Sequence, residues 1–537
     1  MQGSDGVGEL ADAVALAVDA DDRHSAIEIV AERWAMLASS QGRELRDLIE
    51  GLPFDDWNAD PRLLTAIGAS YRSIGTSSRS AALPYFGTAG ALLDGQDDPS
   101  VHSRALLLVH HAAALRSLGL LDGARELADA AWELLEIDVT LTPARRIGAQ
   151  ALIALQQGML DIHLGDYEAA QNRLRLAHGL SEGHLAPPEL VECLAGVAFL
   201  KYTSGDFDGV DEFVERTRAA GPAAVVESQF GAPAFIAELL VAVERGHLQG
   251  ARTLAKRVAS LTARTDWEPL GLYATAAISI ISGGHIEGLD HVHRAQQLLR
   301  TWEGPAVAHR LCEGMRGTLL MHLGELDAAE AIIGALVPTQ NHANCPARFL
   351  AGIRFKAGDS KGCLAALAEC EGLGEAHASR TLIDVLLLKA AANYDLGHAR
   401  LADIAFDRAL LFVSRTRMRT PFTLVPSATM RRMLERAADR GQPDRIHAVL
   451  DDLRAGVGSH GSIGNGAIEP LSERERDVAQ RLYLDKTLSE IAAELFISTN
   501  TVKTHVRSIY RKLEARNRKE AVRRATELGL YLEITPH

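Results

Sequence analysis

Amide, hydroxyl and cationic side chains recur at helical spacing in residues 499–511 of the 537-residue chain. Lysine and arginine can meet guanine N7 and O6 in the major groove of B-DNA, and asparagine can pair with adenine. Steps of three and four residues put side chains on one face of a helix. The set on this face is Asn500, Lys503, Arg507 and Arg511, with Thr504 beside them. The spacing therefore predicts a helix that presents a base-reading surface to double-stranded DNA.

The opposite face of this helix is apolar. Its residues, at steps of four, three and four, are Val502, Val506, Ile509 and Leu513. This stripe predicts a face packed into a core. A basic helix face is commonly only a solvated surface, and the charge pattern alone leaves that alternative open. A short helix and turn directly before it favour DNA contact, because the second helix of such a motif enters the major groove.

Capping residues mark the helix starts in this region. A serine or threonine three residues before a glutamate forms a capping box, which satisfies free amide groups of the first turn. Capping pairs of this spacing are Ser472 with Glu475, Thr487 with Glu490, and Asn517 with Glu520. Ser498 or Thr499 can cap the basic helix after a turn at Phe496. The pattern predicts four helices.

Charge is distributed unevenly along the chain. The whole chain has a net charge of −14, whereas residues 498–524 contain nine basic and two acidic side chains, a local charge of +7. An acidic body with one basic element is not a general polyanion binder. It indicates a single nucleic-acid contact element.

Residues 471–522 closely resemble the LuxR/FixJ-type DNA-binding domain. The matching elements are LSERERDV, EIAAELFIS, TNTVKTHVRSIYRKL and RKEAV. The resemblance implies that the third helix reads the major groove and that the fourth, about 518–528, pairs two domains into a dimer. Asp485 and Glu514 stand where the family usually has glycine, which concerns the tight turns and not the reading face.

The resemblance also implies roles for individual residues. Lys503, Thr504 and Arg507 occupy the base-contacting positions. Candidates for phosphate contact are Asn500, Thr501 and Arg511, and Thr499 at the helix start completes the DNA-binding set. The positions that match structural residues of the family are Glu475, Ile491, Ala492, Val502 and Ile509.

A turn of the type Gly-x-apolar-x-small recurs between helical patterns in the long N-terminal part. Its glycines, 34 to 46 residues apart, are Gly119, Gly165, Gly205, Gly246, Gly284, Gly324, Gly358 and Gly397. A period near 40 residues with one helix pair per unit predicts an α-solenoid. The unit LDIHLGDYEAAQNRLRLA resembles a tetratricopeptide repeat, and the others resemble it more loosely.

The predicted fold is all-α and has four parts. They are an N-terminal helical region (1–80), tetratricopeptide-like repeats (81–453), a flexible glycine-rich linker (454–470) and a four-helix helix-turn-helix domain (471–530). Pro53 and Pro61 should flank a turn, and Trp34, Phe54 and Trp57 should lie in the core. Repeats followed by this module also resemble the C-terminal half of large MalT-like LuxR regulators. Their ATP-binding domain is not expected here, because no GxxxxGK[ST] occurs.

Five scattered cysteines without a CxxC pair argue against a disulfide framework and fit a reducing cytoplasm. His342 and Cys345 have the spacing of half a metal site. No second pair stands nearby in the sequence, so both are expected to be loop residues, and no metal or cofactor is predicted. Neither a membrane span, a secretory signal nor a catalytic motif is expected.

Two classes of function remain. The +7 charge of residues 498–524 favours a sequence-specific transcription regulator. Such a regulator is expected to bind DNA as a homodimer, and its repeats are expected to sense a protein, peptide or small-molecule effector. The alternative is an interaction scaffold whose C-terminal module contacts protein, with RNA polymerase as a candidate, rather than DNA.

Overall fold

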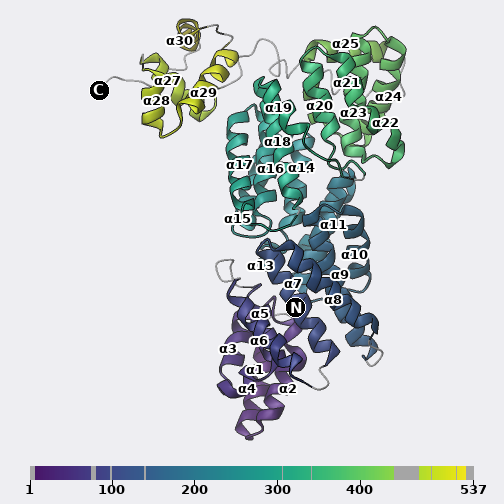
Figure 1. The fold of residues 1–537 in the computed structure, drawn as a ribbon, viewed down its shortest axis with the longest axis vertical. Coiled ribbons are helices and arrows are strands. Elements are labelled where there is room, and N and C mark those ends of the chain that lie inside the picture. Colours follow the sequence, from purple (N-terminus) through teal and green to yellow (C-terminus); the bar gives the residue numbers. More distant parts are fainter. Residues whose placement is uncertain are drawn as a thin grey trace.

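The computed structural model of the chain is described for residues 6–73, 80–96, 100–137, 141–304, 306–339, 341–440, 471–484, 486–513, 515 and 517–527. Helices dominate this part of the chain, which holds no strand and only one isolated β-bridge, between Leu120 and Glu303. The predicted all-α class is confirmed. Figure 1 shows the helices stacked along the long axis of the molecule, with residues 471–527 (yellow) forming a small bundle of their own. None of the helices described here combines the length and the apolar character needed to span a bilayer.

The N-terminal helices pack around two apolar clusters, of which the second holds the buried residues of the last helix. The helices are α1 (Gly6–Asp19), α2 (Arg23–Arg33), α3 (Gly42–Glu50), α4 (Phe54–Asn58), α5 (Pro61–Ser70) and α6 (Leu83–Asp94). Pro61 opens α5 as predicted, but the segment between Pro53 and Pro61 forms the short helix α4 where only a turn was expected. Trp34 is buried and Trp57 packs against the first cluster, but the core position expected for Phe54 is wrong. Phe54 is 62% exposed because it opens a five-residue helix that buries none of its residues.

Eight antiparallel helix pairs follow, one for each predicted repeat. The pairs are α7 (Val101–Ser117) with α8 (Leu121–Ile137), α9 (Pro143–Leu164) with α10 (Tyr167–Gly179), α11 (Pro187–Ser204) with α12 (Phe207–Ala219), α14 (Ala232–Glu244) with α15 (Leu248–Thr262), α16 (Glu268–Ser282) with α17 (His285–Leu299), α18 (Val307–Leu323) with α19 (Leu326–Ile333), α20 (Pro346–Lys356) with α21 (Ser360–Ala366), and α23 (Ser379–Asp395) with α24 (Ala399–Thr416). Shorter helices between or after them are α13 (Ala223–Val226), α22 (Ala368–Leu373) and α25 (Ser427–Asp439). One continuous apolar core runs through these pairs from Ala105 to Ala437.

A left-handed glycine separates the two helices of each pair. Seven of the eight predicted glycines have φ between +75° and +88°. The exception is Gly284, whose φ is −76°; its neighbour Gly283 takes the left-handed conformation at +79°. Glycine suits this position because residues with a Cβ atom are sterically strained in the left-handed conformation. In three turns the next residue is an aspartate that caps the second helix by accepting the amide hydrogen three residues on, and these are Asp166, Asp206 and Asp359.

The C-terminal bundle contains α27 (Glu473–Tyr483), α28 (Leu488–Leu495), α29 (Thr499–Lys512) and α30 (Arg518–Glu527). Both predicted serine or threonine capping boxes form, at Ser472 and at Thr487. Asn517 accepts the amide hydrogen of Glu520, as expected for the start of α30. The bundle has a separate apolar core. The predicted linker 454–470 and the family departures Asp485 and Glu514 lie outside the described residues.

Candidate nucleic-acid interface

Helix α29 presents two contrasting faces. The predicted inward stripe is buried: Val502 and Leu513 are 0% exposed, and Val506 and Ile509 are also buried. On the other face Thr499, Asn500, Lys503, Arg507 and Arg511 are exposed, and Thr501 and Thr504 are half-buried. All seven predicted contact residues therefore lie on one helix and are reachable from solvent. Their side chains carry the donors and acceptors that base edges and phosphates require.

The turn before α29 fixes where the reading face begins. Helix α28 ends at Phe496, whose φ of +55° reverses the chain in the left-handed region. Ser498 then caps α29 by accepting the amide hydrogen of Thr501 at 3.1 Å. Of the two predicted caps, Ser498 and Thr499, the first is used. Thr499 is consequently the first helical residue and stands at the end of α29 where free amide groups favour anions.

Two hydroxyl groups of the predicted set have local partners. The Thr504 hydroxyl donates to the Asn500 carbonyl at 3.0 Å, and the Thr501 and Ser498 hydroxyls lie 2.7 Å apart. Because the Thr504 hydroxyl hydrogen is bonded within the helix, this side chain can offer DNA only its oxygen lone pairs and its methyl group. A thymine methyl group is a suitable partner for such a surface.

A buried carboxylate holds α29 against α27. Glu475 accepts hydrogen bonds from the Ser508 hydroxyl at 2.6 Å, from the Lys512 ammonium at 2.7 Å, and from its own capping partner, the Ser472 amide, at 2.7 Å. Burial alone would raise the pKa of Glu475, but the Lys512 charge and these hydrogen bonds lower it below its ordinary value. The roles of Ser508 and Lys512 were not predicted from the sequence. Lys512 directly follows Arg511, the last residue of the cationic face, but its side chain points inward.

One predicted base-contacting residue is engaged elsewhere. Arg507 forms an ion pair at 2.7 Å with Glu325, the residue directly before α19 in the solenoid. The two side chains are 74% and 45% exposed, so water screens the pair and it is weak. The same guanidinium cannot bind Glu325 and a guanine at once.

A second candidate site is a cavity inside the solenoid. It measures about 60 Å³ and lies among α11, α14, α16, α18, α20 and α23. Its charged lining residues are paired: Arg348 with Asp384, and Arg380 with Glu244 at 3.4 Å. Burial raises the pKa of Asp384 above its ordinary value, against the opposing charge of Arg348. The Nδ2 atom of Asn344 and the Nε atoms of Arg348 and Arg380 are buried without a hydrogen-bond partner.

Comparison with known proteins agrees with the geometry of the C-terminal bundle. Residues 469–525 match the luxR family of bacterial regulatory proteins. The chain is 44% identical over 59 residues to the spore germination protein GerE of Bacillus subtilis, a stretch that covers 11% of this chain and 80% of GerE. The chain therefore belongs to the luxR family, and its C-terminal domain is a DNA-binding helix-turn-helix domain of a transcription regulator.

Other relatives share the same segment. The transcriptional regulator MalT of Vibrio cholerae is 44% identical over 59 residues, which cover 11% of this chain and only 6% of MalT. The probable regulator NarL of Mycobacterium tuberculosis is 46% identical over 55 residues, or 10% of this chain and 26% of NarL. Among solved structures, the hetero-tetramer Cut9–Hcn1 aligns over 97% of this chain and 96% of its own at 14% identity, with a TM-score of 0.40.

Proposed function

We propose that the protein is a sequence-specific transcription regulator that inserts α29 into the major groove. Lys503, Thr504 and Arg507 would contact base edges, while the sugar–phosphate contacts would fall to Thr499, Asn500, Thr501 and Arg511. The proposal is supported by one observation above all. Five members of this set are exposed on the outward face of α29 and Thr501 and Thr504 are half-buried there, while the inward face is fixed by a buried stripe and by Glu475.

The assignment is tested by binding to the operator selected from random duplexes by the full chain. Lys503→Ala and Arg507→Ala should each weaken binding by about 1–3 kcal/mol and relax the preference at one base pair. Arg511→Ala should weaken all sequences alike and reduce the slope of log K against log salt by about one. Lys361→Ala is the matched control, because it removes an equal charge from an exposed position on α21. Equal operator affinities for wild type and Arg507→Ala would refute the role of Arg507.

We further propose that the protein binds DNA as a homodimer. One domain of this size covers a small footprint, and luxR-type modules carry their fourth helix, here α30, as a pairing element. Two domains would then contact half-sites about one helical turn apart. Inserting about five base pairs between the half-sites turns one of them to the opposite side of the duplex. Binding should then lose cooperativity, as measured by electrophoretic shifts. Monomers bound to single half-sites with undiminished affinity would contradict this arrangement.

We also propose that the solenoid senses an effector. The cavity at Arg348 and Arg380 favours a small anionic or carbonyl group, since buried donors there have no partner. Its volume of about 60 Å³ matches roughly two water molecules, so a larger effector must open it. Thermal unfolding of the full chain with acetate or phosphate tests this. A rise in Tm that Arg348→Gln abolishes would support the site, and no rise would direct the search to a protein partner such as RNA polymerase.

The proposed regulator acts on chromosomal DNA, and we therefore place it in the cytoplasm. It needs no catalytic step of its own, since binding and release of the operator suffice.

A further inference from the structure

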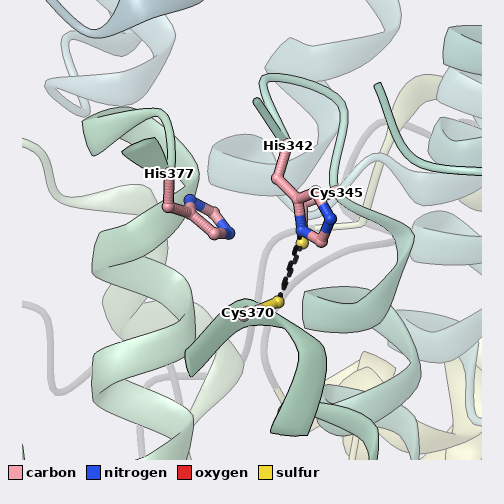
Figure 2. A group of neighbouring side chains, drawn as sticks. All are labelled: His342, Cys345, Cys370 and His377. Carbon is pink, nitrogen blue, oxygen red and sulfur yellow. Dashed lines mark hydrogen bonds between the residues drawn. The ribbon is translucent and has the colours of Figure 1, made fainter. Parts of the chain in front are cut away.

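Two cysteines and two histidines converge inside the solenoid, away from the DNA-binding domain. His342 and Cys345 lie in the connection between α19 and α20, Cys370 lies on α22, and His377 lies two residues before α23. All four are buried, and their ligand atoms lie within 4.8 Å of one another. Figure 2 shows the four side chains pointing toward one another. His342 and Cys345 are loop residues, as expected, but the expectation that no second pair lies near them is wrong, because Cys370 and His377 meet them in the fold.

The distances match those of a tetrahedral metal ion. The two sulfur atoms of Cys345 and Cys370 are 3.6 Å apart, and the Cys370 sulfur lies 3.5 Å from His342 Nδ1. Zinc binds sulfur at about 2.3 Å and nitrogen at about 2.0–2.1 Å. In a tetrahedron these bonds separate two sulfurs by about 3.8 Å and a sulfur from a nitrogen by about 3.5 Å. A small contraction or expansion of the cluster would complete the geometry.

The hydrogen bonds of His377 leave one ring nitrogen available to the cluster. Its Nδ1 lies 3.1 Å from the Ala378 carbonyl, and because a carbonyl can only accept, Nδ1 carries the hydrogen. The lone pair is therefore on Nε2, which is buried without a hydrogen-bond partner. Metal-ligating histidines commonly donate their other nitrogen to a carbonyl in this way. A buried, unpartnered imidazole nitrogen is costly unless a ligand occupies it.

The backbone around the cluster is held in place by side chains of α23. The Thr381 hydroxyl donates to the His342 carbonyl at 2.7 Å, and Arg380 donates to the Ala343 carbonyl at 2.8 Å. His342 itself has a φ of +54°, a left-handed conformation that is uncommon for non-glycine residues. Twelve residues separate α19 from α20, and their described part contains no regular element. So long a connection inside a compact array normally needs something to order it.

We propose that His342, Cys345, Cys370 and His377 bind one Zn²⁺ ion in a structural site. Two thiolates and two imidazoles form a donor set that suits zinc, whereas magnesium and calcium prefer oxygen. The protein fills all four positions, which leaves no open position for a water or substrate and separates this site from catalytic zinc. The ion would tie the connection before α20 to α22 and to the start of α23. Asn344, which lines the cavity, lies between two of the ligands.

A disulfide is the competing use of the two cysteines. Both are free thiols in the structure. A disulfide would bring the sulfurs to about 2.05 Å and would leave both imidazoles without a role. The convergence of four donor side chains therefore favours the metal.

Metal analysis of the full chain tests the proposal. Protein purified without chelator should contain about one zinc per chain, and Cys345→Ser and Cys370→Ser should each lose it. Cys363→Ser is the matched control, because Cys363 is equally buried on the neighbouring α21 but lies outside the cluster. It should keep its zinc. Equal zinc content in wild type and both cluster variants would overturn the proposal.

Cobalt binding to the wild-type chain decides the matter should the cysteine variants fail to fold. After zinc is removed by a chelator, Co²⁺ should restore one equivalent of metal, with the sulfur-to-cobalt charge-transfer and visible bands of a tetrahedral dithiolate site. Added Zn²⁺ should abolish these bands. Wild-type chain that holds no zinc and yields no such bands would overturn the proposal, as would a peptide map showing Cys345 and Cys370 joined in a disulfide.

Discussion

At the scale of single residues, Glu475 determines how α29 is held against α27. It is 4% exposed and accepts hydrogen bonds from α29 through Ser508 and Lys512. Glu475→Gln would remove the carboxylate charge that pairs with the buried Lys512 ammonium, and breaking such a buried pair costs roughly 3–5 kcal/mol. Hydrogen exchange of the α29 amides in the full chain should therefore accelerate strongly. Glu494→Gln, which alters an exposed pair with Arg481, should change exchange little; equal effects of the two substitutions would contradict this role of Glu475.

His110 makes the folded chain sensitive to acid. It is buried beside Trp34, and burial, with the nearby Arg72 charge, lowers its pKa from 6.5 to about 3. Between pH 6.5 and pH 3, His110 is protonated in the unfolded chain but neutral in the folded chain. Its contribution to the free energy of unfolding is therefore complete above pH 6.5 and is lost progressively as the pH falls towards 3. Urea unfolding at several pH values should show a shallower fall for His110→Phe than for wild type. Identical slopes would show that His110 does not titrate in this way.

At the scale of elements, the glycine turns are not equivalent. An added Cβ at Gly165, which has a φ of +82°, would lie 2.9 Å from a Val307 methyl carbon of α18. At Gly358, with a φ of +83°, nothing lies within 4 Å of an added Cβ. Gly358→Ala should cost only the left-handed backbone strain of about 1–2 kcal/mol. Gly165→Ala should cost more, because packing between hairpins must also shift; equal losses in urea unfolding would contradict this.

Local patterns account for what could be predicted about these elements. Caps such as Ser472 and Ser498 act within three residues, and the stripe of α29 repeats within one turn, so the sequence reveals both directly. Which of the adjacent glycines, Gly283 or Gly284, takes the left-handed conformation could not be predicted, because either of them can adopt a positive φ. The His342–His377 cluster forms only when α20, α22 and α23 pack, so residues 35 positions apart give little sign of proximity. The recurrence of a second Cys and His pair, with wider spacing, was the available signal.

At the scale of the whole molecule, the ion pair between Arg507 and Glu325 of the solenoid would compete with the proposed contact of Arg507 with DNA. Glu325→Gln should raise the operator affinity of the full chain by no more than about fivefold, since exposed ion pairs contribute at most about 1 kcal/mol. Asp327→Asn is the matched control, because it removes an equal charge two residues away on an exposed position of α19. Fluorescence anisotropy with labelled operator measures both. A drop in affinity for Glu325→Gln, or equal gains in the two variants, would argue against competition at this contact.

Because the solenoid and the C-terminal bundle have separate apolar cores, the two parts can be recombined with other domains. Among the described residues, no side chain belongs to both clusters. In a chimera, a DNA-binding domain with a different operator preference could replace residues 471–527 without any repacking of the core of the helix array. The surface of the array around Glu325, His285 and Lys356 would then face a different neighbour, while its buried core would stay unchanged. The array and the DNA-binding domain can therefore be inherited independently.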